Sequence, residues 1–343
     1  MSSALRCDVL VIGLGPAGAS AAAAAARAGA RVIAIERKRE VGVPVQCAEF
    51  IPLPLSRHAP AAARAQAIDG MATFLPSGER TERAFGGLMI RRERFDQALA
   101  QAAAAAGAEL WLEAALEKLD AAAGTARAKG TAIRFRAAVA ADGPHSAAAA
   151  LLGLDRLPTV HTRQYTVPLA RPHTDTDIWL SPRYPGGYAW LFPKGEVANL
   201  GLGFDAAIEP DLKAPLEDLH AALVRQGRVG REILLRTGGL IPVGGLRERL
   251  VHGKVAFAGD AAGLTHPVTG AGIAQAVLSG ERAGEAAAGG ALAAYEEEMR
   301  EEFGPALERA LAVRKRMADV WRSREAGDAA HRRGWIAFEE YYA

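Results

Sequence analysis

The chain has 343 residues, of which 50% are hydrophobic and 23% charged, with 41 lysines and arginines against 39 aspartates and glutamates. A formal net charge of +2 creates no global field that would attract nucleic acid or an anionic membrane, so we expect no nucleic-acid partner. Two cysteines, Cys7 and Cys47, are too few for a disulfide framework and predict a reducing, cytoplasmic location. Because no uninterrupted apolar run reaches the length of a membrane-spanning helix, we expect membrane contact to be peripheral at most.

Residues 8–36 have the pattern of a strand, a glycine-rich turn, a helix and a second strand. An apolar run, residues 9–12, leads into Gly13, Gly15 and Gly18, which have G-x-G-x-x-G spacing, and an alanine-rich segment follows. In a dinucleotide-binding fold the first glycine permits the tight turn and the second lets the backbone approach a pyrophosphate. The third lets the helix and strand pack closely. The sequence therefore predicts a βαβ unit that binds a dinucleotide.

The two ends of this unit supply further predicted cofactor contacts. The helix should begin at Pro16 and Ala17, where its N-terminal amides and partial positive charge face the phosphates. Glu36 lies 23 positions after Gly13, where a carboxylate can accept hydrogen bonds from both ribose hydroxyls of an adenosine. We expect the adjacent Arg37 to contact the cofactor too. A tight structural turn without a ligand would explain the glycines but not the acid.

A later segment, residues 253–280, indicates which dinucleotide is bound. It contains a short apolar strand, then Gly259 and Asp260, then a turn rich in glycine and proline, and then a helix start. This arrangement resembles the second FAD-binding stretch of the para-hydroxybenzoate hydroxylase-like flavoproteins. The resemblance implies that Asp260 binds the ribityl chain and that the N-terminal dipole of the helix faces the flavin. The residues at the helix start that we expect to contact FAD are Gly270, Ala271, Gly272 and Ile273.

Two shorter motifs fall in the order that such flavoproteins require. Arg92 begins an R-x-x-F-D helix start, and Asp142 precedes a glycine at the end of a predicted strand. Singly, these motifs would be a solvated arginine and a strand-ending turn. In this order and spacing they imply two more FAD contacts. The predicted fold class is α/β: a Rossmann-type FAD-binding domain with an inserted antiparallel-sheet substrate domain and C-terminal helices.

Two further stretches, GVPVQCAEF and PGGYAWLFPKGEVANLGLG, resemble the geranylgeranyl reductase family of FAD-dependent oxidoreductases. The second stretch matches that family's Y-x-W-x-F-P pattern, followed after seven residues by G-x-G. The resemblance implies that this stretch lines a substrate cavity above the flavin, through Tyr188, Trp190, Phe192 and Pro193. It also implies that Cys47 lies beside the flavin ring. Ala48 occupies a position where the family usually has glycine, and alanine disfavours a positive φ.

The family resemblance implies a reaction: reduction of carbon–carbon double bonds in an apolar, isoprenoid-like substrate by hydride transfer from reduced FAD. The chain has no second nucleotide-binding motif, so we expect NAD(P)H, if it is the electron donor, to dock transiently. A ferredoxin-type donor is equally compatible. Three alternatives stay open: a flavoprotein that passes electrons to a redox partner enzyme, a flavin monooxygenase, and a flavin-binding module without catalytic activity. No cluster of histidines and cysteines has metal-ligand spacing.

Several residues have both a catalytic and a structural interpretation. Cys47 is either a proton donor to the substrate or a small packing residue beside the flavin. Glu49 is either an acid in the site or a solvated loop carboxylate. His266 either delivers protons or stabilises a turn. The aromatic stretch around Trp190 is either a cavity wall or ordinary core.

The domain ranges predicted from these motifs are 1–155 and 249–290 for FAD binding, 156–248 for the substrate sheet and 291–343 for a C-terminal helical segment. Within the last range, Tyr295, Met299 and Phe303 have helical spacing, which we expect to break at Gly304-Pro305. A basic segment and an aromatic tail follow. The tail either packs on its own domain or forms a docking patch for a lipid surface or a partner.

Overall fold

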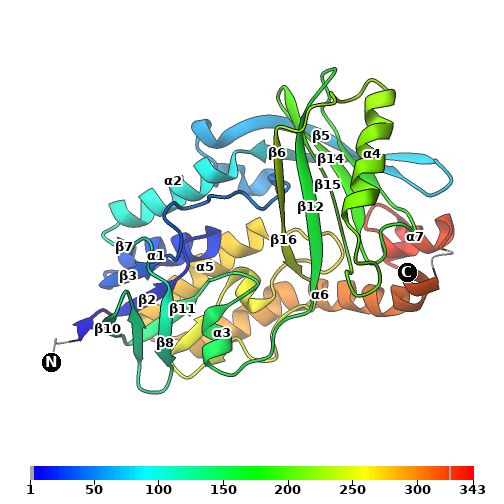
Figure 1. Cartoon of the computed structure of the whole chain (residues 1–343). Helices are drawn as coiled ribbons and strands as arrows, with labels where there is room; N and C mark the ends of the chain where they lie inside the picture. Colours follow the sequence, from blue (N-terminus) through cyan, green and yellow to red (C-terminus); the bar gives the residue numbers. More distant parts are fainter. Residues whose placement is uncertain (1–3, 324–325) are drawn as a thin grey trace.

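The computed structural model describes residues 4–323 and 326–343, which form two large sheets with helices packed beside each (Figure 1). A smaller four-stranded sheet, in the order β1-β10-β9-β8, lies near the N-terminus. Its strands are Leu5–Arg6 (β1), Leu116–Asp120 (β8), Thr125–Ala128 (β9) and Thr131–Arg134 (β10). Within the described residues no helix is both long and apolar enough to cross a membrane.

The first large sheet has six strands in the order β17-β18-β11-β2-β3-β7. All neighbours pair in parallel except β17 and β18. The central strands are buried at every position, which is why the sequence shows them as continuous apolar runs. The strands are Val9–Ile12 (β2), Val32–Ile35 (β3), Glu109–Trp111 (β7), Ala137–Ala140 (β11), Val251–His252 (β17) and Val255–Phe257 (β18). The predicted Rossmann-type unit is confirmed.

Helices α1 (Pro16–Arg27) and α5 (Ile273–Gly289) pack against each other beside this sheet, and α2 (Arg92–Ala105) packs on α1. The contact between α1 and α5 depends on glycine. A Cβ at Gly280 would lie 2.1 Å from the carbonyl oxygen of Ala17, and one at Gly284 would lie 2.2 Å from that of Ala21. The two glycines therefore let α5 pack tightly against α1 of the first βαβ unit.

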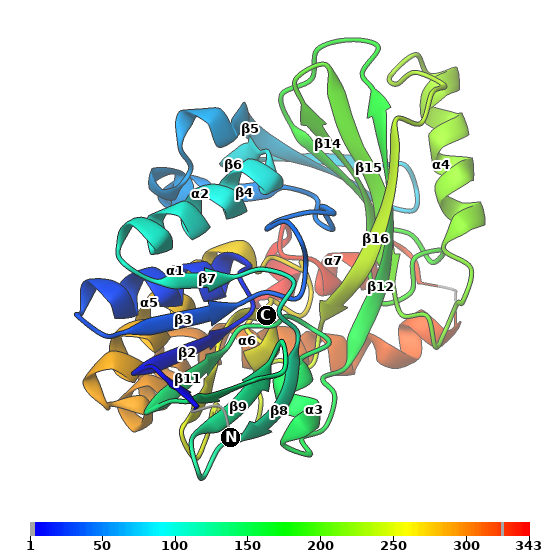
Figure 2. The same ribbon diagram turned by 60° about the vertical axis from the view of Figure 1, so that its left-hand side comes forward.

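The second large sheet has eight strands in the order β16-β12-β15-β14-β13-β5-β6-β4. Its pairs are antiparallel apart from β13 and β5, which run parallel. Figure 2 shows this sheet standing beside the six-stranded one, with α4 on its outer face. The elements are Phe50–Pro52 (β4), Arg64–Phe74 (β5), Arg80–Ile90 (β6), Thr159–Pro168 (β12), Thr176–Trp179 (β13), Tyr188–Lys194 (β14), Val197–Phe204 (β15), Leu235–Pro242 (β16) and Lys213–Arg225 (α4).

Alternation along the central strands gives this sheet two different faces. Tyr165, Leu191 and Leu202 belong to a buried cluster that also contains Leu216 and Leu223 of α4. The intervening residues of the same strands face the other way, toward the six-stranded sheet. Strands β12 to β15 lie within the range predicted for the substrate sheet, residues 156–248, but β4, β5 and β6 come from within residues 1–155. The eight-stranded sheet therefore contains strands from outside the range predicted for it, residues 156–248.

The C-terminal region differs from the prediction at one point. Helix α6 runs without a break from Leu292 to Ser323, with Pro305 inside it. A proline in a helix costs about 3 kcal/mol because it removes one hydrogen bond and crowds the preceding turn. The buried residues of α6 continue past the proline, through Leu307 and Val313 to Met317, and this packing outweighs the local cost.

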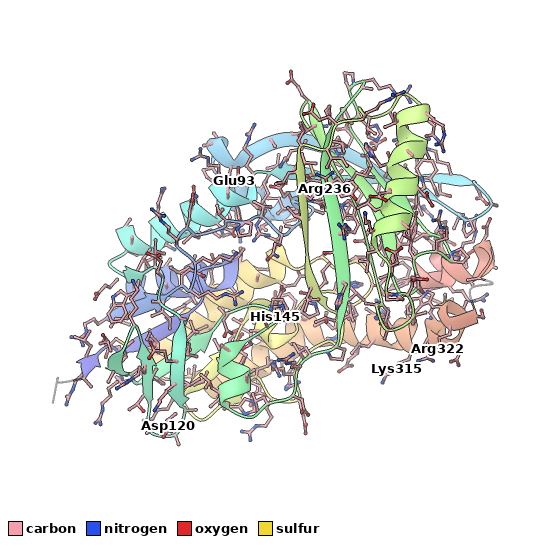
Figure 3. All side chains as sticks on the ribbon, viewed as in Figure 1. Glu93, Asp120, His145, Arg236, Lys315 and Arg322 are labelled. Carbon is pink, nitrogen blue, oxygen red and sulfur yellow. The ribbon has the colours of Figure 1, made fainter. Side chains whose placement is uncertain are left out.

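The aromatic tail packs on its own chain. After α7 (Asp328–Gly334), the side chains of Trp335, Phe338 and Tyr341 are each only 3% exposed. The basic residues of α6, such as Lys315 and Arg322, lie exposed along its outer side (Figure 3). Of the two interpretations of the tail, the structure favours packing over an aromatic docking patch.

Candidate active site

Two adjoining cavities lie between the six-stranded and the eight-stranded sheet. The sheet-edge cavity, of about 410 Å³, lies at the carboxyl ends of β2, β3 and β11. The aromatic cavity, of about 320 Å³, lies between α5 and the inner face of the eight-stranded sheet. Gly15, Gln46, Arg92 and Asp260 border both, so the cavities form one elongated site.

The glycine turn after β2 shapes the junction of the two cavities. Gly13 has φ +93°, and a Cβ there would lie 2.5 Å from the carbonyl oxygen of Ala141. A Cβ at Gly18 would lie 1.8 Å from the carbonyl oxygen of Gly13. At Gly15 a Cβ would meet no protein atom within 4 Å, because this position faces the site. Gly13 and Gly18 are therefore required by the fold, whereas Gly15 leaves room for a ligand. Pro16 and Ala17 border the aromatic cavity beside Gly15.

Glu36 and Arg37 lie at the far end of the sheet-edge cavity. The Glu36 carboxylate accepts hydrogen bonds from the backbone N–H of Leu14 and of Lys38, each at 2.9 Å. Carboxylate oxygens can accept more than one hydrogen bond each, so capacity for ribose hydroxyls is left. This geometry fits the adenosine end of a dinucleotide.

Asp142 and Asp260 border the middle of the elongated site. One oxygen of Asp142 accepts a hydrogen bond from the backbone N–H of Ala148 at 2.9 Å. Its Oδ1 is buried and has no hydrogen-bond partner among the described residues. Asp260 accepts a hydrogen bond from the Thr265 hydroxyl at 2.6 Å. Burial raises the pKa of both carboxyl groups. A bound group with hydroxyl donors, such as a ribityl chain, would satisfy these acceptors.

The start of α5 faces the aromatic cavity. Gly270, Ala271, Gly272 and Ile273 all border it, and the helix has no side-chain cap at Gly272. Its first amides and the positive end of its dipole are therefore free to stabilise negative charge in the cavity. The preceding short helix, Gly259–Ala262, packs on α1 through Gly259, which has φ +58°.

Arg92 lies between the cavities but is held by the protein. Its Nε and one terminal nitrogen donate hydrogen bonds to the two carboxylate oxygens of Asp96, both at 2.9 Å. Its backbone N–H donates to Glu49 Oε1 at 2.9 Å. This pairing fixes the guanidinium at the cavity border, where it provides a positive charge near Cys47 and Asp260.

The loop that carries Cys47 enters the aromatic cavity and is held there by the eight-stranded sheet. Gln164 Nε2 donates a hydrogen bond to the carbonyl oxygen of Cys47 at 3.1 Å, and Asn199 Nδ2 donates to that of Ala48 at 3.2 Å. Burial raises the pKa of the Cys47 thiol, and the nearby Arg92 charge opposes this shift without cancelling it. At neutral pH the group is therefore a thiol with a proton to donate.

Glu49 is not a solvated loop carboxylate: it borders the aromatic cavity, and its carboxylate is held by protein groups. It is 2% exposed and forms an ion pair with Lys194, and Asn199 Nδ2 donates to its Oε2 at 2.8 Å. Its backbone takes the left-handed conformation, with φ 70°, while Ala48 does not. The positive φ expected at position 48 is therefore found at Glu49, where the buried ion pair and hydrogen bonds stabilise this strained conformation.

The predicted aromatic wall borders the cavity. Tyr188, Trp190 and Phe192 line it, with ring centroids 5.7 Å apart for the first pair and 6.4 Å for the second. The indole Nε1 of Trp190 donates a hydrogen bond to Gln164 Oε1 at 3.1 Å, and a Cβ at position 201 would lie 2.4 Å from the indole ring. Pro193 is buried but does not border the cavity, because alternation along β14 turns it to the opposite face.

His266 stabilises a turn. Its Nδ1 accepts hydrogen bonds from the backbone N–H of Val268 at 3.3 Å and of Thr269 at 3.2 Å. Burial lowers the pKa of this histidine to about 4, so the imidazole is neutral near pH 7 and does not act as a cationic proton donor there. His145, labelled in Figure 3, borders a third cavity, which adjoins the elongated site because Gln46 and Asp260 border it as well. In residues 4–323 and 326–343, no group of three or more His, Cys, Asp or Glu side chains is placed to hold a metal ion.

Several residues that line the aromatic cavity, or that hold the Cys47 loop beside it as Asn199 does, were not predicted from the sequence. Gln164 and Asn199 lie on strands recognised only as strands, and period-2 alternation from Trp190 would have placed both on the inner face. Trp335 and Ile336 reach the aromatic cavity from the C-terminal tail. No local pattern indicates that long-range contact.

The fold and the two joined cavities define a flavoprotein with a Rossmann-type FAD-binding domain. The chain matches no family model. It is 32% identical to digeranylgeranylglycerophospholipid reductase of Methanothrix thermoacetophila, with 91% of this chain and 87% of that protein covered. It is 34% identical to digeranylgeranylglycerophospholipid reductase 1 of Methanopyrus kandleri, with 92% of each covered. The crystal structure of a geranylgeranyl bacteriochlorophyll reductase-like protein from Thermoplasma acidophilum superposes with a TM-score of 0.84 at 26% identity, over 94% of this chain and 91% of that one. The chain belongs to the geranylgeranyl reductase family of FAD-dependent oxidoreductases.

Proposed function

We propose that this enzyme reduces carbon–carbon double bonds in an apolar, isoprenoid-like substrate. The observation that carries the proposal is the position of the half-buried Cys47 thiol, which borders the same cavity as the start of α5 and the aromatic wall. Apart from Lys194 and Glu196, residues 186–204 are uncharged, which suits an apolar guest. The names of the relatives, which specify a lipid with two geranylgeranyl chains, support an isoprenoid acceptor.

The residues of the site divide the chemistry between them. Bound FAD, in its reduced form, would supply a hydride to one carbon of the double bond. The Cys47 thiol donates its proton to the other carbon, so that two hydrogens are added and a thiolate remains. The nearby Arg92 charge stabilises this thiolate until water returns the proton. The α5 N-terminus and Asp260 hold the cofactor, and Tyr188 and Trp190 orient the substrate and exclude water.

The electron donor is part of the same proposal. We infer that it docks transiently, as reduced nicotinamide dinucleotide or as a ferredoxin-type protein. Mixing the oxidised enzyme anaerobically with NADH, NADPH or reduced ferredoxin, and following flavin bleaching, separates these donors. The donor should bleach the flavin at a rate that saturates with its concentration.

The function is tested by photoreducing the FAD-loaded enzyme without oxygen and adding candidate acceptors. Prenyl diphosphates or prenyl lipids should restore the oxidised flavin spectrum. Quinones and oxygen serve as comparisons. Reoxidation by oxygen alone, with a hydroxylated product when substrate is present, would indicate a monooxygenase instead. Reoxidation only by a partner protein would indicate an electron-transfer flavoprotein.

A further inference from the structure

The aromatic cavity has one end that reaches the surface. Tyr188, Trp190 and Phe192 follow one another at every second residue of β14 and so extend the wall over about 13 Å. Beyond Phe192 the wall continues through Phe50, whose ring lies 6.2 Å from it, to Phe85, whose ring stacks on Phe50 at 5.6 Å. Phe85 is 38% exposed, so this end opens to solvent.

The opposite end of the wall is closed by the C-terminal tail. The ring of Trp335 lies 4.8 Å from that of Tyr188, and Trp335 is only 3% exposed. Trp335 and Ile336 both border the aromatic cavity. A second, small cavity of about 20 Å³ lies on the other side of Trp335, bordered by Met317 and His331. The indole therefore separates the aromatic cavity from further space inside the protein.

The tail is anchored to the same sheet that carries the wall. The backbone N–H of Ser77, in the β5–β6 turn, donates a hydrogen bond to Asp328 at 3.0 Å, and Arg332 forms an ion pair with Glu79. Arg83 Nε donates to the carbonyl oxygen of Ala337 at 3.1 Å. Figure 1 shows α7 beside the eight-stranded sheet. These contacts on both sides of Trp335 hold its indole as a fixed stop.

We propose that Trp335 is the end wall that limits the length of the isoprenoid chain, with the far end of the chain against the indole and the polar headgroup at the Phe85 end. This inference rests on the proposed function and adds a specificity-determining residue and an orientation. The orientation follows from the headgroup, which must stay hydrated at the open end. A fixed indole at the closed end limits the length of chain that the cavity can hold, because adding atoms to a well-packed interior is destabilising.

The test compares acceptors of increasing length: geranyl, farnesyl and geranylgeranyl diphosphate. The measured quantity is kcat/KM for the longest acceptor divided by kcat/KM for the shortest. In Trp335→Ala this ratio should rise about tenfold or more, because one extra methylene bound in an apolar pocket changes kcat/KM by about tenfold or more. Trp335→Phe should give a smaller change. Tyr341→Ala removes a buried aromatic of the same tail that does not border the aromatic cavity, and should leave the ratio unchanged.

A second measurement uses the wild-type enzyme and does not depend on a folded variant. A farnesyl diphosphate analogue with a photoreactive diazirine on its last isoprene unit should label the peptide that contains residues 331–338. Labelling near Phe85 instead would reverse the proposed orientation and overturn the inference. An unchanged ratio in Trp335→Ala, or an equal rise in Tyr341→Ala, would also overturn it. Failure of the wild type to oxidise its flavin with any prenyl acceptor would instead refute the proposed function.

Discussion

Gln164 joins Cys47 to Trp190: its Nε2 donates to the Cys47 carbonyl oxygen and its Oε1 accepts from the indole Nε1, both at 3.1 Å. One amide side chain therefore sets the position of the thiol relative to the aromatic wall. The link spans 117 residues of sequence and connects the cysteine loop to the eight-stranded sheet.

Replacing Gln164 with Leu should remove both hydrogen bonds while keeping the volume. We expect kcat for flavin reoxidation by substrate to fall about tenfold, which corresponds to about 1.4 kcal/mol, the scale of a lost buried hydrogen bond. FAD affinity should stay near that of the wild type because Gln164 does not border the sheet-edge cavity. Thr159→Ala, on the same strand, is the control. Unchanged kcat in Gln164→Leu would show that the link does not position the thiol.

Cys47→Ala should slow substrate-dependent reoxidation much more than Cys47→Ser does, because serine keeps a hydroxyl donor in place. Burial raises the thiol pKa, so the wild-type rate should stay flat as the pH passes the value at which an ordinary cysteine ionises. Stopped-flow reoxidation across that pH range measures both. Equal and negligible effects of the two substitutions would assign Cys47 to packing alone.

Alanine substitutions at Gly15 and Gly18 distinguish a loss of FAD binding from a loss of folding. Gly15→Ala should fold normally, since φ is −69° and a Cβ meets no protein atom within 4 Å, yet it should lose most FAD affinity as the methyl enters the phosphate site. Gly18→Ala places its Cβ 1.8 Å from a backbone oxygen and should not fold stably. Circular dichroism and flavin content give the two readouts. A yellow, FAD-saturated Gly15→Ala protein would contradict this placement of the pyrophosphate.

His266 should make the protein sensitive to mild acid. Its folded-state pKa, about 4, lies below the value of about 6.5 expected when unfolded, so the unfolded chain binds more protons between these pH values. Stability should therefore be lost as pH falls through this window, by up to about 3 kcal/mol from this group. In His266→Asn, whose side-chain oxygen replaces Nδ1 as acceptor, the free energy of unfolding should depend less on pH. An equally steep dependence in the variant would assign the effect elsewhere.

Residues whose role is local were predictable from the sequence. Gly13 and Gly18 serve a turn and a close contact, and Glu36 directly follows a strand, so spacing alone located them. The aromatic wall was predictable because β14 alternates strictly. The same alternation places Pro193 on the opposite face, away from the cavity that its family resemblance predicts it to line.

Residues whose role depends on distant packing were not predictable. The continuity of α6 through Pro305 depends on a buried seam, and the position of Trp335 depends on contacts with the β5–β6 hairpin, some 250 residues earlier in the chain. Glu49 could be assigned only when Lys194 and Asn199 were seen around it. Contacts between residues so far apart in the chain produce no periodic pattern in the sequence.

The central claim, that the enzyme adds hydrogen to a carbon–carbon double bond, is tested most directly by the mass of the product. FAD-loaded enzyme is photoreduced under argon, mixed with a prenyl diphosphate or prenyl lipid acceptor, and the product is analysed by mass spectrometry. The account predicts a product heavier by two hydrogens per turnover, without added oxygen, and formed far more slowly by Cys47→Ala. An unchanged acceptor, or one that gains oxygen when air is admitted, would contradict it.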